Sequence, residues 1–339
     1  MSVIDVIQQR FALNAIGKVE YRYQARILGK QTGWWIWIQQ RTVDAALIVA
    51  IFFVLLSMAS ILFNTDISPF INSIPLLVIF PPIVAIVIHF GLLTRTTILS
   101  SNSISRERQQ QSWELLILTG VDAERIVLGK WVATIRSLWP AFLRLGILRA
   151  SLVVFLGSYL NGPPGYGNLS YFSGDYQIFV PTVLHFGIAL LFVFLVTVAN
   201  LLFTAACGVA ASARHQRAGV SLARGFGIRL AIIGLMVGGT LVIGFFISRI
   251  FFDLSLPDFI GQLLTALFAA FASMLDNGAL LGANFVFTRV QYGESPVNSQ
   301  AYLVVAMVGL LVIYLGLSRV LLGGTIRHLI RQGVLPAKA

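Results

Sequence analysis

The chain has 339 residues, of which 57% are hydrophobic and only 11% are charged, whereas a soluble domain carries about 25% charged residues. This composition indicates an integral membrane protein and excludes the soluble enzyme folds and the disordered class, while the single cysteine, Cys207, excludes a disulfide-rich secreted domain. A formal net charge of +11 would favour a nucleic-acid ligand in a soluble chain, but here it has a topological cause, so no nucleic-acid partner is expected.

Residues 1–43 are expected to stay on the mature chain as a cytoplasmic segment, because they lack the short apolar core and the small-residue cleavage site of a signal peptide. Within them, residues 14–30 are expected to form an amphipathic interfacial helix. Its apolar positions are Ile16, Val19, Tyr23 and Ile27, its basic positions are Lys18, Arg22 and Arg26, and Trp34, Trp35 and Trp37 follow at the expected headgroup level. Two interpretations are open: a helix that leads into the first span, or a basic anchor held by anionic membrane lipids.

Six apolar stretches reach the ~20 residues that a helix needs to cross a bilayer. They are residues 45–63, 74–99, 138–160, 180–211, 229–250 and 302–322. A further stretch, 260–288, is interrupted by Asp276, Asn277 and Gly278 and is expected to be re-entrant or to lie at the outer surface. Residues 44–339 are thus expected to form one transmembrane domain.

The loops predict the orientation of these spans. The loops at 64–73 and 161–179 contain no Lys or Arg, whereas basic residues precede the first span and follow the second, the fourth and the last. The positive-inside rule therefore places both termini on the cytoplasmic side. The expected location is the cell membrane, meaning the plasma or inner membrane. Six spans agree with this orientation, whereas a seventh would place the basic tail outside.

Residues 103–130, between the second and third spans, are rich in charged and amide side chains and are expected to form a cytoplasmic helical hairpin. Residues 106–118 contain good helix formers without Gly or Pro, Thr119 and Gly120 supply a stop, and Asp122 is expected to cap the next helix. The apolar stripe of the first helix is Trp113, Leu116 and Ile117, flanked by Glu107, Arg108 and Glu114. Residues 106–114 carry two basic and two acidic side chains, and this neutral balance favours docking to a partner over binding to an anionic lipid surface.

Three motifs in this hairpin lie close together: Ser105-Arg106-Glu107-Arg108, W-E-L-L-I-L-T at 113–119, and E-R-I-V-L-G-K at 124–130. They resemble the signature of the membrane-spanning permease subunits of type-2 ABC exporters. Gln111 stands where that family often has Gly, and Gly120 where it often has Pro. The amphipathic connecting helix before the family's first span is similar at Asn14, Glu20, Arg22 and Arg26, and the six-span layout with a re-entrant piece between the fifth and sixth spans is similar too.

The resemblance implies that residues 105–119 hold a coupling helix that sits in a cleft of a separate ATPase subunit. Its expected contacts are Arg106, Glu107, Arg108, Trp113, Glu114, Leu115, Leu116 and Thr119, with Glu107 and Glu114 as charged contacts and Trp113 and Leu116 as packing contacts. The chain has no G-x-x-x-x-G-K-[ST] phosphate loop, so ATP and Mg²⁺ are expected in two copies of the partner ATPase, and no catalytic, cofactor or metal site is expected in this chain. The alternative for these charges is a solvated helix face without a partner.

Two arginines, Arg144 and Arg149, lie inside the third apolar stretch. A charged group at bilayer depth costs at least ~2.5–3.5 kcal/mol unless it faces a cavity or a partner, which makes both residues candidates for the transport pathway. The competing explanation is that the span starts later and both side chains reach the cytoplasmic headgroups.

The sequence therefore predicts an all-α polytopic membrane protein with an interfacial helix, six transmembrane helices and a cytoplasmic coupling helix. It predicts a permease that forms the substrate path with a second copy of itself or with a related permease, with the first, second and fifth spans lining the path by resemblance. Two other classes are open. One is a non-transporting membrane anchor or assembly factor that recruits a cytoplasmic partner through the same helix. The other is an intramembrane enzyme, which the lack of a Ser/His pair, a carboxylate pair or a metal cluster on adjacent spans disfavours.

Overall fold

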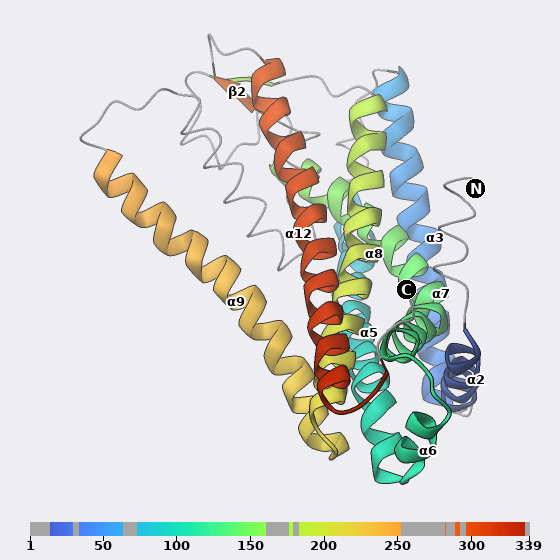
Figure 1. The fold of residues 1–339 in the computed structure, drawn as a ribbon. Helices are drawn as coiled ribbons and strands as arrows, with labels where there is room; N and C mark the ends of the chain where they lie inside the picture. Colours follow the sequence, from blue (N-terminus) through green and yellow to red (C-terminus); the bar gives the residue numbers. More distant parts are fainter. Residues whose placement is uncertain are drawn as a thin grey trace, which may run out of the picture.

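A computed structural model describes residues 14–29, 34–63, 73–160, 176–178, 183–251, 282, 289–291 and 296–335. Within these ranges the chain forms eight helices (Figure 1). They are α2 (Ala15–Gly29), α3 (Trp34–Phe63), α5 (Pro75–Gln109), α6 (Ser112–Leu118), α7 (Ala123–Leu160), α8 (Val183–Arg214), α9 (Ala218–Phe251) and α12 (Pro296–Arg331). Two three-residue strands, β1 (Tyr176–Ile178) and β2 (Arg289–Gln291), pair antiparallel and are the one departure from an all-helical chain in the described ranges.

Six of these helices contain a stretch long and apolar enough to cross a membrane. The stretches are Ile38–Ala59, Leu76–Gln109, Ala123–Val154, Leu184–Arg214, Ala218–Gly239 and Leu303–Arg331. The prediction of six spans is confirmed by this count, which indicates a multi-pass membrane protein. Apart from Gly282, the stretch 260–288 that was expected to be re-entrant, including Asp276, lies outside the described residues.

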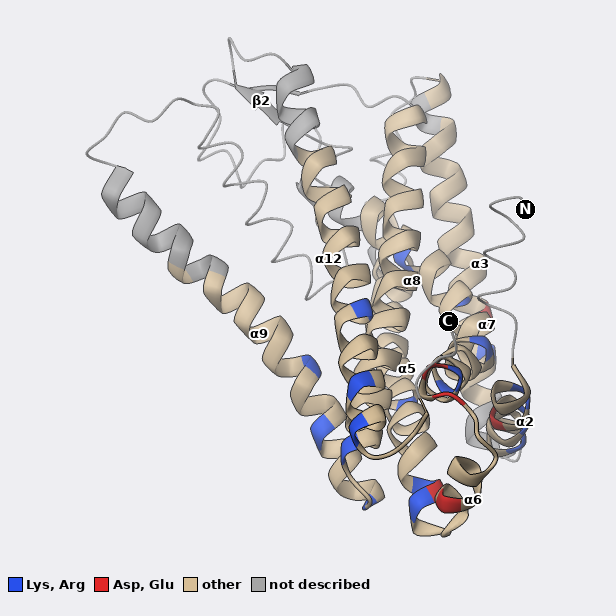
Figure 2. Ribbon diagram, viewed as in Figure 1, with Lys and Arg blue, Asp and Glu red and all other residues tan. Residues whose placement is uncertain are grey.

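The helices are longer than a bilayer requires, and the excess collects at one end of the bundle. α5 has 35 residues and spans about 52 Å at 1.5 Å per residue, against a hydrocarbon core of about 30 Å. Charged residues gather where α5 ends, α7 begins and α2 and α6 lie (Figure 2). We call this region the charged end.

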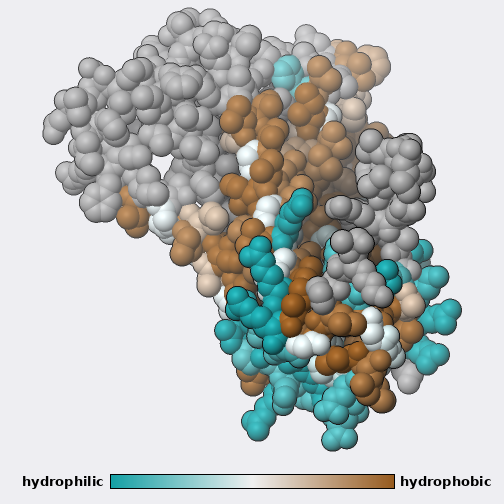
Figure 3. Space-filling view, viewed as in Figure 1, coloured by the Kyte–Doolittle hydropathy of each residue, from teal (hydrophilic) through white to brown (hydrophobic). Residues whose placement is uncertain are grey.

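Most of the remaining surface is apolar, as expected of helices that face lipid. The outward faces of α3, α5 and α9 expose side chains such as Ile48, Leu76 and Leu235, which are 70%, 85% and 74% exposed. In Figure 3 hydrophobic residues cover the described helices along their length and hydrophilic residues collect at the charged end. α8 lies between α5, α7 and α12 and supplies much of the core. α9 touches α8 and α5 and then leans away from α12 (Figure 1).

Small and hydroxyl residues let α5 and α8 approach closely. The Ser212 hydroxyl of α8 accepts hydrogen bonds from the backbone N–H groups of Ile104 (2.8 Å) and Ser105 (2.9 Å) of α5. A Cβ added to Gly208 would overlap the Ser100 hydroxyl and lie 3.0 Å from the backbone nitrogen of Ser101. Small residues at helix contacts are the usual means of close packing in membranes, where lipid is as apolar as the side chains.

This contact predicts that Gly208→Ala lowers the thermal unfolding midpoint of the detergent-solubilised protein, because overpacking costs about 1–3 kcal/mol. Gly309→Ala on α12 is the matched control, since nothing lies within 4 Å of a Cβ at that position and alanine is the better helix former by about 1 kcal/mol. Its midpoint should not fall. Equal midpoints for the two variants would contradict the close approach of α5 and α8.

Candidate functional site

The hairpin at the charged end differs in one respect from the sequence prediction. The expected continuous helix 106–118 is wrong: α5 runs on to Gln109, and α6 starts separately at Ser112. The break lies at Gln111, whose backbone is left-handed with φ 58° and ψ 10°. The turn lets Trp113 fold back into the core, where it is only 8% exposed. Burying a large side chain gains about 1.5–3 kcal/mol, which offsets the ~1–2 kcal/mol cost of a left-handed non-glycine residue.

The turn geometry suits Gly120, one of the two departures from the exporter signature, but gives no reason for Gln111, the other. Glycine, which the family often has in place of Gln111, adopts a left-handed backbone without strain. Gly120 has φ +69° and ends α6, a conformation that proline cannot adopt because its ring fixes φ near about −65°. Asp122 then precedes α7, and its carbonyl accepts the N–H of Ile126 at 3.2 Å. This places Asp122 at the predicted capping position.

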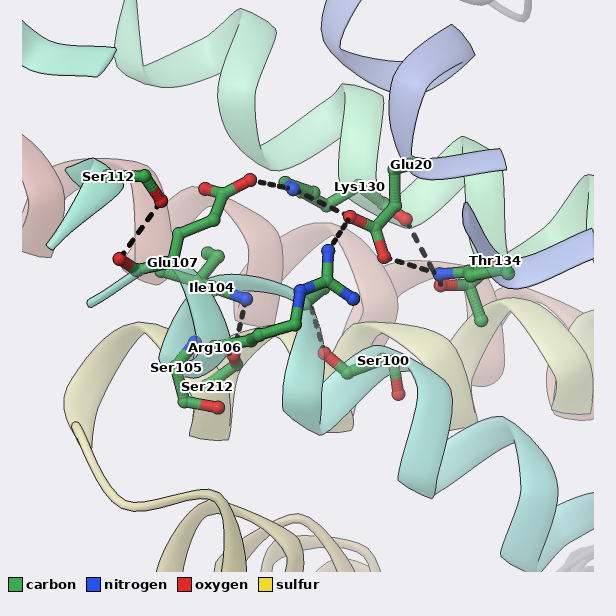
Figure 4. A network of polar contacts seen from close by, with 12 residues as sticks. Glu20, Ser100, Ile104, Ser105, Arg106, Glu107, Ser112, Lys130, Thr134 and Ser212 are labelled. Carbon is green, nitrogen blue, oxygen red and sulfur yellow. Dashed lines mark hydrogen bonds and ion pairs between the residues drawn. The ribbon is translucent and has the colours of Figure 1, made fainter. Parts of the chain in front are cut away.

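Four charged residues from three separate helices meet at the centre of the charged end (Figure 4). Glu20 of α2 accepts hydrogen bonds from Lys130 of α7 (2.7 Å) and Arg106 of α5 (3.0 Å). Lys130 also pairs with Glu107 of α5. The Glu20 and Lys130 side chains are only 1% and 2% exposed. We call these four residues the buried ion network; its two acids and two bases balance.

Neutral polar groups complete the docking of α2 on α7. Gln24 donates to the Glu20 carboxylate (3.0 Å) and to the Thr134 hydroxyl (3.2 Å), and Ser137 donates to the Gln24 carbonyl oxygen (2.9 Å). Thr134 and Ser137 both belong to α7, so these bonds hold the Gln24 face of α2 against that helix.

Asn14 fixes the start of α2 from the same side. Its side-chain oxygen accepts the N–H of Gly17 (2.7 Å) and its side-chain nitrogen donates to the carbonyl of Arg125 (2.6 Å). A Cβ on Gly129 would lie 2.5 Å from the Asn14 side-chain oxygen. The residues that carry the exporter resemblance at Asn14, Glu20, 105–108 and 124–130 are therefore brought together in space.

The predicted helix at 14–30 is confirmed as α2, and of its four apolar positions Ile16 alone packs against a described core cluster. The residues buried against the bundle are Gly17, Glu20 and Gln24. Val19, Tyr23 and Ile27 are 69%, 40% and 37% exposed, and the basic positions Arg22 and Arg26 are also exposed. An exposed apolar stripe beside basic side chains suits the surface of a membrane, which agrees with both interpretations of this segment. Tyr23 also stacks under Arg106, whose guanidinium carbon lies 3.6 Å from the ring centre.

The structure divides the eight residues expected to contact an ATPase into inward and outward groups. Arg106 and Glu107 belong to the buried ion network. The expectation that Trp113 packs on a partner is corrected, because Trp113 lies in the chain's own core with Ile104, Ile126 and Leu329, and Leu116 packs against the same cluster. Arg108 bonds to Gln332 and lies 4.9 Å from the Trp113 ring centre. Glu114, Leu115 and Thr119 face outward.

The two candidate pathway arginines have different surroundings. Arg144 is exposed on α7, whereas Arg149 is 2% exposed and bonds to Thr197 of α8 (3.0 Å) and His89 of α5 (2.6 Å). A second buried arginine, Arg229 of α9, donates to Asn200 of α8 at 3.1 Å. Neither His89 nor Arg229 was predicted as a site residue, although His89 lies inside the apolar stretch 74–99 and Arg229 at the start of the stretch 229–250.

No group of three His, Cys, Asp or Glu side chains that could hold a metal ion occurs in the described part of the chain. Comparison with protein-family models, with curated proteins and with solved structures finds no match to this chain. The described geometry can transmit movement between helices. It connects the short helix α6, which has an outward face, to the end of α5, to the beginning of α7 and, through the buried ion network, to α2.

The buried ion network predicts the effect of removing one charge. Lys130→Met leaves Glu20 and Glu107 short of a partner, and breaking a buried pair costs about 3–5 kcal/mol, so the thermal midpoint in detergent should fall sharply. The double variant Lys130→Met, Glu107→Gln should lose less, because Glu20 and Arg106 still balance. Lys18→Met is the matched control: Lys18 is an exposed lysine of α2, and exposed charges contribute about 0–1 kcal/mol. A double variant as unstable as Lys130→Met would refute the charge-balance explanation.

Proposed function

We propose that the chain is the permease subunit of an ATP-driven exporter. Two permease chains, identical or related, would form the substrate path, and two separate ATPase subunits would supply ATP hydrolysis with Mg²⁺. In this proposal the charged end faces the cytoplasm, as the positive-inside rule predicts for both termini, and α6 is the coupling element.

The observation that supports the proposal is the way α6 is packed: one side is buried in the core and the other is exposed. One side of this helix is fixed in the core through Trp113, while Glu114, Leu115 and Leu118 point away from the bundle. A force applied to the outward side would reach α5 and α7 directly, because α6 lies in the connection between them. It would reach α2 through the buried ion network.

The outward side of α6 has the composition of a contact surface. Leu115 and Leu118 are 66% and 81% exposed, and they lie at the charged end rather than on the apolar faces of the spans. Exposed apolar groups next to a charged side chain such as Glu114 are typical of protein interfaces. A membrane anchor that only recruits a cytoplasmic protein would use the same surface, so the identity of the partner decides between the two functions.

The test is to purify the tagged chain from its native membrane in mild detergent and to identify the proteins that accompany it by mass spectrometry. We expect an ATPase with a phosphate-binding loop. Glu114→Lys should remove it by reversing the charge of the docking surface, while the chain still inserts and keeps its thermal midpoint. ATP hydrolysis by the recovered complex should fall in parallel.

Glu124→Lys is the matched control, because Glu124 is also an exposed acid at the charged end but belongs to α7. It should keep the ATPase. Loss of a partner that has no nucleotide-binding motif would support the anchor function instead. Equal recovery of the ATPase with all three chains would contradict the assignment of α6.

A further inference from the structure

The segment after the last span returns to the hairpin at the charged end. α12 ends at Arg331, and Gly333, with φ +89°, turns the chain. The N–H of Val334 then bonds back to the Leu329 carbonyl at 3.2 Å. We call residues 332–335 the C-terminal turn.

Three contacts fix the C-terminal turn beside α6. The Gln332 side chain accepts a hydrogen bond from Arg108, near the end of α5. Val334 is 2% exposed and packs in the same cluster as Trp113. The carbonyl of Leu335 accepts the N–H of Ala123, the first residue of α7, at 2.9 Å.

These contacts place the Leu335 side chain next to the end of α6. A Cβ on Gly120 would lie 3.8 Å from Leu335 Cδ1, and Gly120 follows Leu118 by two residues. Leu335 is 47% exposed, although its backbone is held in place. The exposed Leu335 side chain thus lies beside the end of α6 that carries the exposed Leu118, and Leu115 is exposed one turn earlier on the same helix.

We propose that the docking surface for the cytoplasmic ATPase is composite, with Leu335 of the C-terminal turn as its third apolar contact beside Leu115 and Leu118. This inference rests on the proposed function and extends it to a part of the chain that carries none of the exporter motifs. With Glu114 next to the leucines, the surface fits an apolar groove of the ATPase that is flanked by a Lys or Arg side chain.

The composite surface connects the last span to the same partner as α5 and α7. Movement of the ATPase against α6 would also displace the C-terminal turn and, through it, the end of α12. Because Leu335 is tied to Ala123 through its main chain, its side chain can be changed without removing that bond.

The experiment uses the ATPase recovered with the wild-type chain, purified and returned at known concentration to purified full-length variants in detergent. Leu335→Glu is expected to weaken binding at least about tenfold, which corresponds to about 1.4 kcal/mol, and Leu118→Glu at least as much. Ile330→Glu adds the same charge to an exposed residue of the last turns of α12 (37% exposed), outside the C-terminal turn, and should bind like the wild type. Leu335→Ala, which adds no charge, should weaken binding by a smaller factor and decides the matter if Leu335→Glu lowers the thermal midpoint.

The outcomes separate this inference from the proposed function. If Leu118→Glu weakens binding while Leu335→Glu and Leu335→Ala bind like the wild type, the surface consists of α6 alone and the composite surface is wrong. If Leu118→Glu also binds like the wild type, or if no ATPase accompanies the wild-type chain, the proposed function is wrong and the inference falls with it.

Discussion

The pairing of Glu20 with Lys130 is the constraint on which the charged end depends. Both side chains are almost fully buried, and replacing such a network by well-packed apolar groups is often neutral or stabilising. Its effect is therefore on geometry more than on net stability. Sliding α2 by one residue along α7 would leave a carboxylate and an ammonium group buried without partners, at several kcal/mol each. The network thus excludes neighbouring registers, and Gln24 and Asn14 exclude alternative rotations.

With α2 fixed, the short helix α6 is held from two sides. The buried ion network fixes the end of α5 and the beginning of α7, between which α6 is connected. The C-terminal turn supports it from the other side through Val334 and the bond from Ala123 to Leu335. A seven-residue helix has too few internal hydrogen bonds to be stable alone, so its position comes from these neighbours. The face that remains uncovered is the one that can meet another protein.

Much of this arrangement could be predicted from the sequence, and the reasons for the rest are specific. The length of the apolar stretches predicted six spans, and the helical spacing of apolar and basic residues predicted α2, because both are local signals. Periodicity could not reveal the packing face of α2, since a buried Glu20 makes sense only once Lys130 is known to lie opposite, 110 residues away. Helix propensity joined residues 106–118 into one helix because no Gly or Pro interrupts them. The break at Gln111 depends on tertiary burial of Trp113, which overrides local preference.

The acids are distributed unevenly over the described structure. Every described carboxylate lies in the first part of the chain, from α2 to the beginning of α7, whereas the described residues of the second part, α8, α9 and α12, include basic but no acidic side chains. Apolar clusters hold both parts together, and the described ion pairs are confined to the first part. α9 belongs to the second part but is attached near its start, where Ser221 donates to the Ser101 carbonyl of α5 (2.9 Å) and Gly225 packs against Thr97. Because α9 then leans away from α12 (Figure 1), a small rotation of α5 at this attachment would be amplified along the length of α9.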